Sequence, residues 1–405
     1  MKFLVVDDST LILHLVEALL ESVGHQVELR NSPLLALQDA SSIKPDVIIT
    51  DLMMPEMDGF ELCKRLREKP ELAATKIVIL SGKSYDFDRR RAQQFGADGY
   101  LTKPVQAESF LKTLDEILAK KLLLTYWGVR GTLPVPGPDS LKYGGNTSCL
   151  TLAVEGEPLL IFDAGSGIKK LSNTLMKYPK QRLTAKIFIT HPHWDHINAL
   201  PFFAPLYQQG NEIEIMGTPH GDTSTRSIIS SQMDDVYFPV TIREFGARVF
   251  FRDLREESLR VGNFQIDTML LNHPGNCLGY RVTHEGRSVC YITDNELFPR
   301  DSAFYNPEFE ARLVEFVRDC DILIADTTYL DHEYPSKVGW GHSCVSEVVN
   351  LAHRAGVKAL HLFHHDPDQD DQAIELKFSQ AQAQLAALGS SVACLCPEEG
   401  NRFIL

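Results

Sequence analysis

The chain has 405 residues, roughly two to three times the length of a usual single domain, so two domains are expected. Hydrophobic residues make up 44% and charged residues 23%, which is typical of a folded globular protein and excludes a disordered or collagen-like chain. The net charge is −14, and the part after residue 121 contributes −11 of it, from 24 basic and 35 acidic side chains. So acidic a surface is a poor match for polymeric nucleic acid, which makes a small substrate the better expectation.

No segment has the pattern of a secretion signal or a membrane span. The N-terminal apolar run Phe3–Val6 is too short for a secretory signal. No later stretch approaches the roughly 18 apolar residues that a membrane helix needs. The eight cysteines are scattered without zinc-knuckle or redox spacing, which favours reduced thiols. We therefore predict a cytoplasmic protein with no membrane partner.

From the N-terminus to residue 121, short apolar runs alternate with segments of helical period. Lys2–Val6 predicts a strand, followed by a helix that Ser9 or Thr10 can cap and Gly24 ends. The apolar stripe expected on this helix consists of Leu11, Leu15, Leu19 and Val23. Val47–Thr50 and Ile77–Leu80 are continuous apolar runs, as in strands that are buried on both faces.

The last helix of this part is expected over Gln106–Lys121. Its inward-facing residues are Phe110, Leu114, Ile117 and Leu118. Strands that alternate with helices in this way predict an α/β domain with a doubly wound, flavodoxin-like parallel sheet. In such a sheet the functional residues lie at the carboxyl ends of the strands.

Acidic and hydroxyl side chains and one lysine stand at these predicted strand ends. They are Asp7 and Asp8 after the first strand, Asp51 after the third, Ser81 after the fourth and Lys103 after the fifth. Carboxylates that converge at one sheet edge repel one another unless a cation neutralises them, and oxygen ligands suit Mg²⁺. One carboxylate can then accept a phosphoryl group, whose oxygens a hydroxyl and an ammonium would hold.

The segments "VVDDS", "PDVIITDLMMPEMDG", "VILSG" and "GYLTKP" make residues 1–121 similar to a response-regulator receiver domain. The resemblance implies that Asp51 is the phosphoacceptor and that Asp7 and Asp8 help to bind Mg²⁺. It also implies that Ser81 and Lys103 sense the phosphoryl group and that Tyr100 is an aromatic switch. A sensor histidine kinase is the implied partner.

The pattern changes at Leu122, so a second domain is expected over residues 122–405. Strands are expected at Leu122–Tyr126, Ser148–Val154, Leu159–Phe162, Lys186–Thr190, Phe264–Leu271, Leu278–Thr283 and Ser288–Thr293. Helices are expected at Gly167–Tyr178, Pro307–Arg318, Ser343–Ala355 and Asp370–Leu388. Paired strands followed by helices predict two sheets sandwiched between helices.

Three histidines and an aspartate fall within six residues directly after the strand Lys186–Thr190. They are His191, His193, Asp195 and His196, a spacing that brings imidazoles and a carboxylate to metal ions. Later strand ends add His273, Asp294 and His364, with His365 as an alternative to His364. All these donors are nitrogen or oxygen, so ligand softness does not separate Zn²⁺ from Mn²⁺ or Fe.

This constellation resembles the metallo-β-lactamase superfamily, whose fold is an αβ/βα sandwich with metals at its open edge. The resemblance implies that His191, His193 and His273 bind one divalent metal. It implies that Asp195, His196 and His364 bind a second and that Asp294 bridges the two. Asp163, in "FDAGSG", is expected to orient a ligand histidine. Zn²⁺ is expected first, with Mn²⁺ or Fe as alternatives.

Gly341-His342-Ser343, downstream of "DILIADTTY", resembles the RNase Z and phosphoribosyl cyclic phosphodiesterase branch of that superfamily. Asp195 and His342 are the residues expected to take part in catalysis, and His342 could protonate a leaving oxygen. Asp326 stands where that branch often carries Glu. The tentative substrate contacts are Arg130, Asn146, Tyr237 and Phe238.

Together these features predict a two-component response regulator in which phosphorylation of Asp51 controls a dinuclear-metal phosphodiesterase. The expected substrate is a small phosphodiester resembling a cyclic nucleotide, and a homodimer is expected. Two alternatives stay open: a metal hydrolase of a lactone or thioester, and a non-catalytic di-iron or metal-sensing output module.

Overall fold

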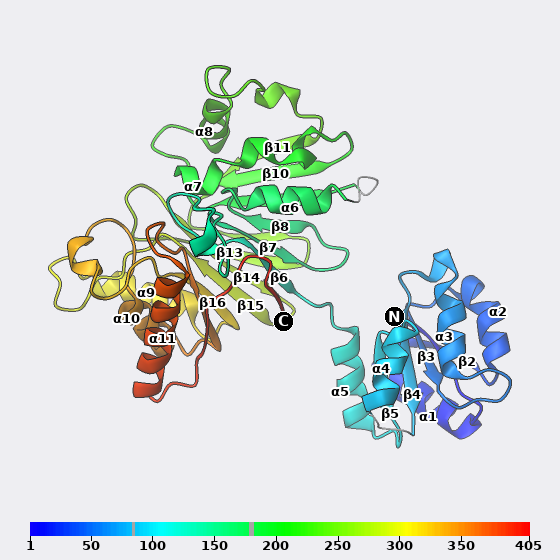
Figure 1. Ribbon diagram of the computed structural model, residues 1–405. Helices are drawn as coiled ribbons and strands as arrows, with labels where there is room; N and C mark the ends of the chain where they lie inside the picture. Colours follow the sequence, from blue (N-terminus) through cyan, green and yellow to red (C-terminus); the bar gives the residue numbers. More distant parts are fainter. Residues whose placement is uncertain (83–85, 178–181) are drawn as a thin grey trace. The chain divides into compact units, whose positions relative to one another are not determined.

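The structure is a computed structural model that describes residues 1–82, 86–177 and 182–405. The chain divides into two compact units, Met1–Lys120 and Lys121–Leu405 (Figure 1). Among the described residues, no helix combines the length and the apolar character needed to cross a membrane.

The first unit is a five-stranded sheet in the order β2-β1-β3-β4-β5, with every neighbouring pair parallel. The predicted doubly wound parallel sheet is thus confirmed. Its strands are β1 (Lys2–Val6), β2 (Gln26–Arg30), β3 (Val47–Asp51), β4 (Lys76–Ser81) and β5 (Gly99–Thr102). Its helices are α1 (Thr10–Ser22), α2 (Pro33–Ile43), α3 (Gly59–Arg67), α4 (Asp86–Gln94) and α5 (Ala107–Leu118).

Helix α1 buries a different stripe from the predicted one. Its buried residues are Leu13, Val16 and Leu20, whereas Leu11 is 76% exposed and Val23 is 51% exposed. The helix is apolar on more than one side, so two stripes satisfy the helical period. Periodicity alone does not decide which of them faces the sheet.

The second unit consists of two seven-stranded mixed sheets. The first has the order β11-β10-β9-β8-β7-β6-β19, and the second the order β12-β13-β14-β15-β16-β17-β18. The strands of the first sheet are β6 (Leu123–Gly128), β7 (Cys149–Ala153), β8 (Leu159–Phe162), β9 (Thr184–Ile189), β10 (Glu212–Gly217), β11 (Arg248–Asp253) and β19 (Arg402–Ile404). Those of the second are β12 (Ser258–Val261), β13 (Phe264–Leu270), β14 (Leu278–His284), β15 (Arg287–Ile292), β16 (Ile322–Asp326), β17 (Ala359–Phe363) and β18 (Ala393–Leu395).

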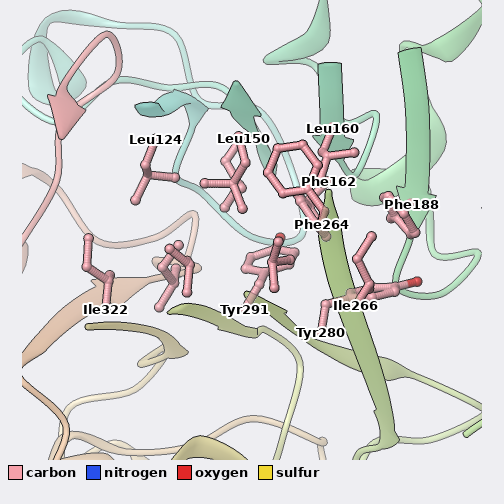
Figure 2. Close-up of a cluster of buried hydrophobic side chains, with 14 of the residues drawn as sticks. Leu124, Leu150, Leu160, Phe162, Phe188, Phe264, Ile266, Tyr280, Tyr291 and Ile322 are labelled. Atoms are coloured by element: carbon pink, nitrogen blue, oxygen red, sulfur yellow. The ribbon is translucent and has the colours of Figure 1, made fainter. Parts of the chain in front are cut away.

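Apolar side chains from the two sheets meet face to face and form the main core of this unit (Figure 2). Phe162 of β8 packs against Phe188 of β9 with ring centroids 5.1 Å apart, and against Tyr280 of β14 at 5.4 Å. Aromatic pairs in such offset and edge-to-face geometry add to the stabilisation that burial provides. The core therefore fixes the two sheets together beneath the edge where the polar strand ends gather.

Helices cover the outer faces of both sheets, which confirms the predicted sandwich (Figure 1). They are α6 (Ile168–Leu175), α7 (Trp194–Ile197), α8 (Thr225–Gln232), α9 (Pro307–Val317), α10 (Val345–Ala355) and α11 (Asp371–Ala387). The C-terminal end of α10 shows how the local sequence ends a helix. Gly356 follows it with φ +64°, the left-handed conformation that glycine favours. The predicted helix Gly167–Tyr178 ends at Leu175 in the structure, and Tyr178 lies outside the described residues.

Candidate functional site

Two buried carboxylates and a lysine meet at the carboxyl edge of the first sheet. The order of the strands places β1 next to β3, which is the point where a doubly wound sheet opens for a ligand. Lys103 Nζ lies 2.7 Å from Asp7 Oδ2 and 2.6 Å from Asp51 Oδ1. Asp7 is fully buried and Asp51 is 5% exposed, while Asp8 is exposed. These all-oxygen donors fit Mg²⁺.

Burial and the charge of Lys103 shift the pKa values of the side chains at this edge. Burial raises the pKa of Asp7, and the hydrogen bond from Lys103 only partly opposes this rise. Burial lowers the pKa of Lys103, but hydrogen bonds to Asp51 and Asp7 outweigh it and leave that pKa raised. Ser81 and Tyr100 lie on the adjoining strands. Burial raises the pKa of Tyr100, and a hydrogen bond with Ser81 works against that rise.

We expect Asp51 to accept one phosphoryl group, because its carboxylate is the one that ends a strand beside both Asp7 and Lys103. Incubation with acetyl phosphate and Mg²⁺ should add one phosphoryl group by intact mass, and Asp51→Asn should remain unmodified. Asp115→Asn, which removes an exposed carboxylate on α5, is the control and should be modified like the wild type. Equal labelling of Asp51→Asn would contradict the assignment.

In the second unit, a histidine and aspartate cluster forms where strands of both sheets end. His191 and His193 follow β9, and the short helix α7 then brings Asp195 and His196 to the same place. Among the described residues, the possible ligand atoms form four groups, in each of which the atoms lie within 4.8 Å of one another; two of these groups include His342, and the other two contain only predicted ligands. One of the latter two is His191, His193 and His273, and the other is Asp195, His196, Asp294 and His364.

Asp294 stands between these two groups. Its Oδ2 lies 3.2 Å from both His196 Nε2 and His364 Nε2. Its Oδ1 lies 3.7 Å from His191 Nε2 and 3.9 Å from His273 Nε2. One carboxylate oxygen therefore faces each group, which is the arrangement that a bridging ligand needs.

The backbone at this cluster takes an uncommon conformation. Asp163, Asp294 and His364 have φ values of +59°, +49° and +60°, in the left-handed region that residues other than glycine rarely adopt. Asp163 and His364 directly follow a strand, and Asp294 lies two residues beyond the end of β15. Such strain persists where the surrounding structure enforces it, and it gathers at functional sites.

Buried partners orient the histidines. His196 Nδ1 donates to Asp163 Oδ2 at 2.8 Å, and Tyr291 donates its hydroxyl to the same oxygen. His273 Nδ1 donates to the carbonyl oxygen of Gly341 at 3.0 Å. Because these bonds use Nδ1, Nε2 of each ring is left for a metal.

The cluster fits metal ions better than it fits a hydrogen-bond network. His191 Nε2 and His196 Nε2 are buried and have no hydrogen-bond partner, which is costly unless something else satisfies them. Burial holds the pKa of His191 well below its usual range, so its imidazole is neutral, the form that binds a metal. Nitrogen and carboxylate donors of this kind suit divalent metals.

His342 lies beside the cluster and is paired with Asp326. His342 Nδ1 is 2.8 Å from Asp326 Oδ2 and 3.9 Å from Asp294 Oδ1. Burial lowers the pKa of His342, but the Asp326 carboxylate more than compensates and raises it to about 9. Asp326 also accepts hydrogen bonds from the backbone N–H groups of Asn295 and Thr328. Asp326 stands where the related branch often carries the longer glutamate, and its shorter side chain still reaches His342 Nδ1.

Glu296, which the sequence did not single out, anchors the segment that carries His342. Its Oε1 accepts hydrogen bonds from the Tyr334 hydroxyl and the Gly339 N–H, and its Oε2 accepts one from the Gly341 N–H, all at 2.8 Å. Glu296 is 2% exposed. The only signal in the sequence was its place two residues after Asp294 in "YITDNE".

The loop after β6 approaches the metal ligands closely. The Thr132 N–H donates to Asp195 Oδ2 at 2.7 Å. A Cβ on Gly131 would lie 2.2 Å from His364 Cε1 and 2.3 Å from its Nδ1, so only glycine fits against this ring. Gly131 therefore packs directly against a candidate ligand.

Gly131→Ala should weaken metal binding about 10–100-fold, the range seen when groups that orient metal ligands are disturbed. The added methyl group can be accommodated only if the His364 ring moves. Metal content after dialysis against a series of buffered metal concentrations measures the effect. Gly137→Ala is the matched control, because a Cβ there meets nothing within 4 Å. Equal metal affinity in both variants would show that the ring has room to shift.

Models of protein families match both units. A response regulator receiver domain matches residues 3–115, and a beta-lactamase superfamily domain matches residues 160–365. The chain belongs to the beta-lactamase superfamily and carries a response regulator receiver domain. It thus joins a receiver to a hydrolase domain of metallo-beta-lactamase fold, a fold that typically holds divalent metals.

Relatives are known for each domain. Protein PilH of Pseudomonas aeruginosa is 36% identical to the receiver over 118 residues, which is 29% of this chain and 98% of PilH. The metallo-beta-lactamase fold protein YhfI from Bacillus subtilis covers 70% of this chain and 100% of its own, with 18% identity and a TM-score of 0.51. Unliganded yeast PDE1 covers 71% of this chain and 100% of its own, with 14% identity and a TM-score of 0.53. The last two likenesses show the fold.

In the beta-lactamase superfamily domain, His364 and His365 point to different surroundings. His364 Nε2 lies 3.2 Å from Asp195 Oδ2, within the cluster. His365 Nδ1 lies 3.4 Å from Lys377 Nζ, and its Nε2 lies 3.5 Å from Cys396 Sγ. The geometry therefore favours His364 as the last ligand.

The four expected substrate contacts of this superfamily domain differ in their surroundings. Arg130 is wholly buried and donates to the carbonyl oxygens of Gly144 and Gln369. The Asn146 side chain donates to Glu399 at 2.9 Å and accepts from Ser166 at 3.0 Å. Arg130 Nη2 is buried and has no hydrogen-bond partner among the described residues. Contact of Arg130 and Asn146 with a substrate stays a prediction.

Tyr237 and Phe238 lie on the surface after α8. Tyr237 is 80% exposed, and Phe238 packs edge-on against Phe202 with ring centroids 5.2 Å apart. Their contact with a substrate stays a prediction.

Proposed function

We propose that the second domain hydrolyses a small phosphodiester at a dinuclear metal centre under the control of phosphorylation at Asp51. The observation that carries this proposal is the His342–Asp326 pair. It places an imidazole at the edge of the metal cluster, beside Asp294, and this histidine is not one of the seven residues proposed as ligands.

The metals would be held by His191, His193 and His273 on one side and by Asp195, His196 and His364 on the other, with Asp294 between them. When bound, such metals activate water and polarise a phosphoryl or acyl oxygen. Asp163 keeps His196 in the tautomer that presents Nε2, and the Gly341 carbonyl does the same for His273. The Thr132 N–H bond holds the Asp195 carboxylate in place.

His342 would act on the leaving group. Its Nδ1–H is held by Asp326, so Nε2 is the atom that can hold a proton for a departing oxygen. The bonds from Glu296 to the N–H groups of Gly339 and Gly341 fix the segment before His342. The imidazole is therefore positioned before substrate arrives.

A small substrate follows from the acidic surface, which disfavours a polyanion. A base or other flat group would stack on exposed aromatic residues near the end of α8, where Tyr237 lies. A cyclic nucleotide or a similar diester has this combination of one charge and one flat group.

The proposal is tested with metal-loaded full-length protein against two substrate panels. One contains cyclic nucleotides and bis(p-nitrophenyl) phosphate, and the other contains lactones and thioesters. Turnover of a phosphodiester at least ten times faster than any lactone or thioester is expected. Hydrolysis of lactones or thioesters alone would contradict the phosphodiesterase proposal and favour a hydrolase of that class. Inactivity with both panels would favour a non-catalytic sensing module.

Phosphorylation of the receiver, with a sensor histidine kinase as the physiological donor, should change turnover or dimerisation. Helix α5 ends at Leu118 and β6 begins at Leu123, so few residues separate the receiver from the hydrolase sheet. A change of about 5-fold or more, the lower end of usual coupling energies, is expected in kcat/KM or in the dimer dissociation constant. Kinetics and light scattering of phosphorylated and unphosphorylated protein measure it. Identical values in both states would make the receiver a passive tether.

A further inference from the structure

A cavity of about 510 Å³ lies within the second unit, apart from the histidine cluster. Residues at the end of β13, the segment that follows Glu296, and helices α9 and α10 form its walls. Its volume is within the range of small-molecule sites. Neither the metal ligands nor His342 line it.

Aromatic and aliphatic side chains form part of the walls of this cavity. Phe298 and Phe304 face each other with ring centroids 5.4 Å apart, and Phe309 and Leu351 come from the two helices. Phe304 is 65% exposed although it is a large apolar residue. A ring left this open at the mouth of a cavity gives a ligand an apolar surface to cover.

Three carboxylates also line the cavity, and they differ in their partners. Glu296 accepts hydrogen bonds from Tyr334, Gly339 and Gly341, so both of its oxygens are occupied. Glu310 accepts a hydrogen bond from the Tyr305 hydroxyl and forms an ion pair with Arg354. Within the described part of the chain, the Glu347 carboxylate has neither a hydrogen bond nor an ion pair.

The positive charges nearby do not neutralise Glu347. Arg312 lines the cavity but pairs with Glu256 at 2.7 Å. Arg300 is close enough to lower the pKa of Glu347, yet burial and the neighbouring Glu310 and Asp331 carboxylates raise it more. The half-buried carboxylate thus lacks a compensating cation, which is an unfavourable state for a desolvated charge.

We infer that this cavity is a binding site for a small organic cation with an apolar body, such as a quaternary or primary amine. Glu347 would pair with the charged nitrogen, and the rings of Phe298, Phe304 and Phe309 would cover the apolar part. Cations are attracted to the faces of aromatic rings as well as to carboxylates, so the two kinds of wall select the same ligand. An anion would face three carboxylates, and a bare metal ion would gain nothing from the rings.

The test measures binding of benzyltrimethylammonium to metal-loaded full-length protein by isothermal titration calorimetry. A quaternary nitrogen cannot coordinate the metals, so any binding reports on a site elsewhere. Benzyl alcohol, which carries the same ring without the charge, is the comparison ligand. We expect the cation to bind at least ten times more tightly than the alcohol.

Variants locate the site. Glu347→Gln should remove the preference for the cation, and Phe304→Ala should weaken binding of both ligands. Glu285→Gln removes an exposed carboxylate in the turn between β14 and β15 and should bind like the wild type. Failure of the cation to bind at millimolar concentration, or an unchanged preference in Glu347→Gln, would overturn the inference.

Discussion

Replacing Asp294 with alanine will strip the second domain of most of its metal and reduce hydrolysis by more than about 100-fold, beyond the 10–100-fold loss typical of groups that only orient ligands. The reason is its position between the two ligand groups, 3.2 Å from His196 Nε2 and from His364 Nε2. Its other oxygen faces His191 and His273. Without this carboxylate, both proposed metals would lose a ligand and a neutralising charge at the same time.

Two further variants separate charge from backbone strain. Asp294 has φ +49°, which asparagine tolerates better than alanine, so Asp294→Asn removes the charge with less added strain. Asp301→Ala removes an exposed carboxylate seven residues further along the chain and should keep the full metal content. Metal per chain by mass spectrometry and turnover are measured on the same samples. Full occupancy in both Asp294 variants would refute the bridging role.

The candidate ligands could be found from the sequence because the fold collects strand ends. His191, His273, Asp294 and His364 each follow an apolar run, and the carboxyl ends of β9, β13, β15 and β17 gather at one edge of the sandwich. The same reasoning brings Asp7, Asp51 and Lys103 together in the first domain. In both domains the apolar run identifies the strand, and the sheet topology brings the residues that follow the strands together.

Residues that act through contacts distant in sequence could not be found in this way. Gly131 is set against His364 more than two hundred residues later, and its neighbour Thr132 bonds Asp195. Glu296 acts on backbone N–H groups of a loop more than forty residues away. These contacts produce no periodicity or motif spacing in the sequence, because tertiary packing determines where a loop residue lies.

The role of Arg130 depends on the same kind of long-range packing. Carbonyl oxygens of Gly144 and Gln369 accept hydrogen bonds from its guanidinium group, while its buried Nη2 has no hydrogen-bond partner within the described part of the chain. Sequence shows that an arginine is present but not whether its partners are internal.

The most direct test of the phosphodiesterase proposal is the loss of His342. His342→Ala should bind its normal complement of metal, because His342 is not among the seven proposed ligands. Metal content is measured on the same sample, since His342 also lies within ligand distance of His273 and Asp294. It should hydrolyse a diester with an alkyl leaving group about 10²–10⁴ times more slowly, the usual contribution of a positioned general acid. His332→Ala, which removes an exposed histidine ten residues earlier, should leave both properties unchanged.

The leaving group then distinguishes the possible roles of His342. An alkoxide must take up a proton as it departs, and His342 Nε2 is the atom proposed to supply it while Asp326 holds Nδ1 at 2.8 Å. A nitrophenolate is stable without that proton, so the defect of His342→Ala should shrink towards wild-type rates for a nitrophenyl diester. If both substrates slow down equally, His342 positions the phosphate and is not the acid. If neither slows down, the phosphodiesterase proposal loses the observation that carries it, and a lactone or thioester hydrolase becomes the better account of this metal centre.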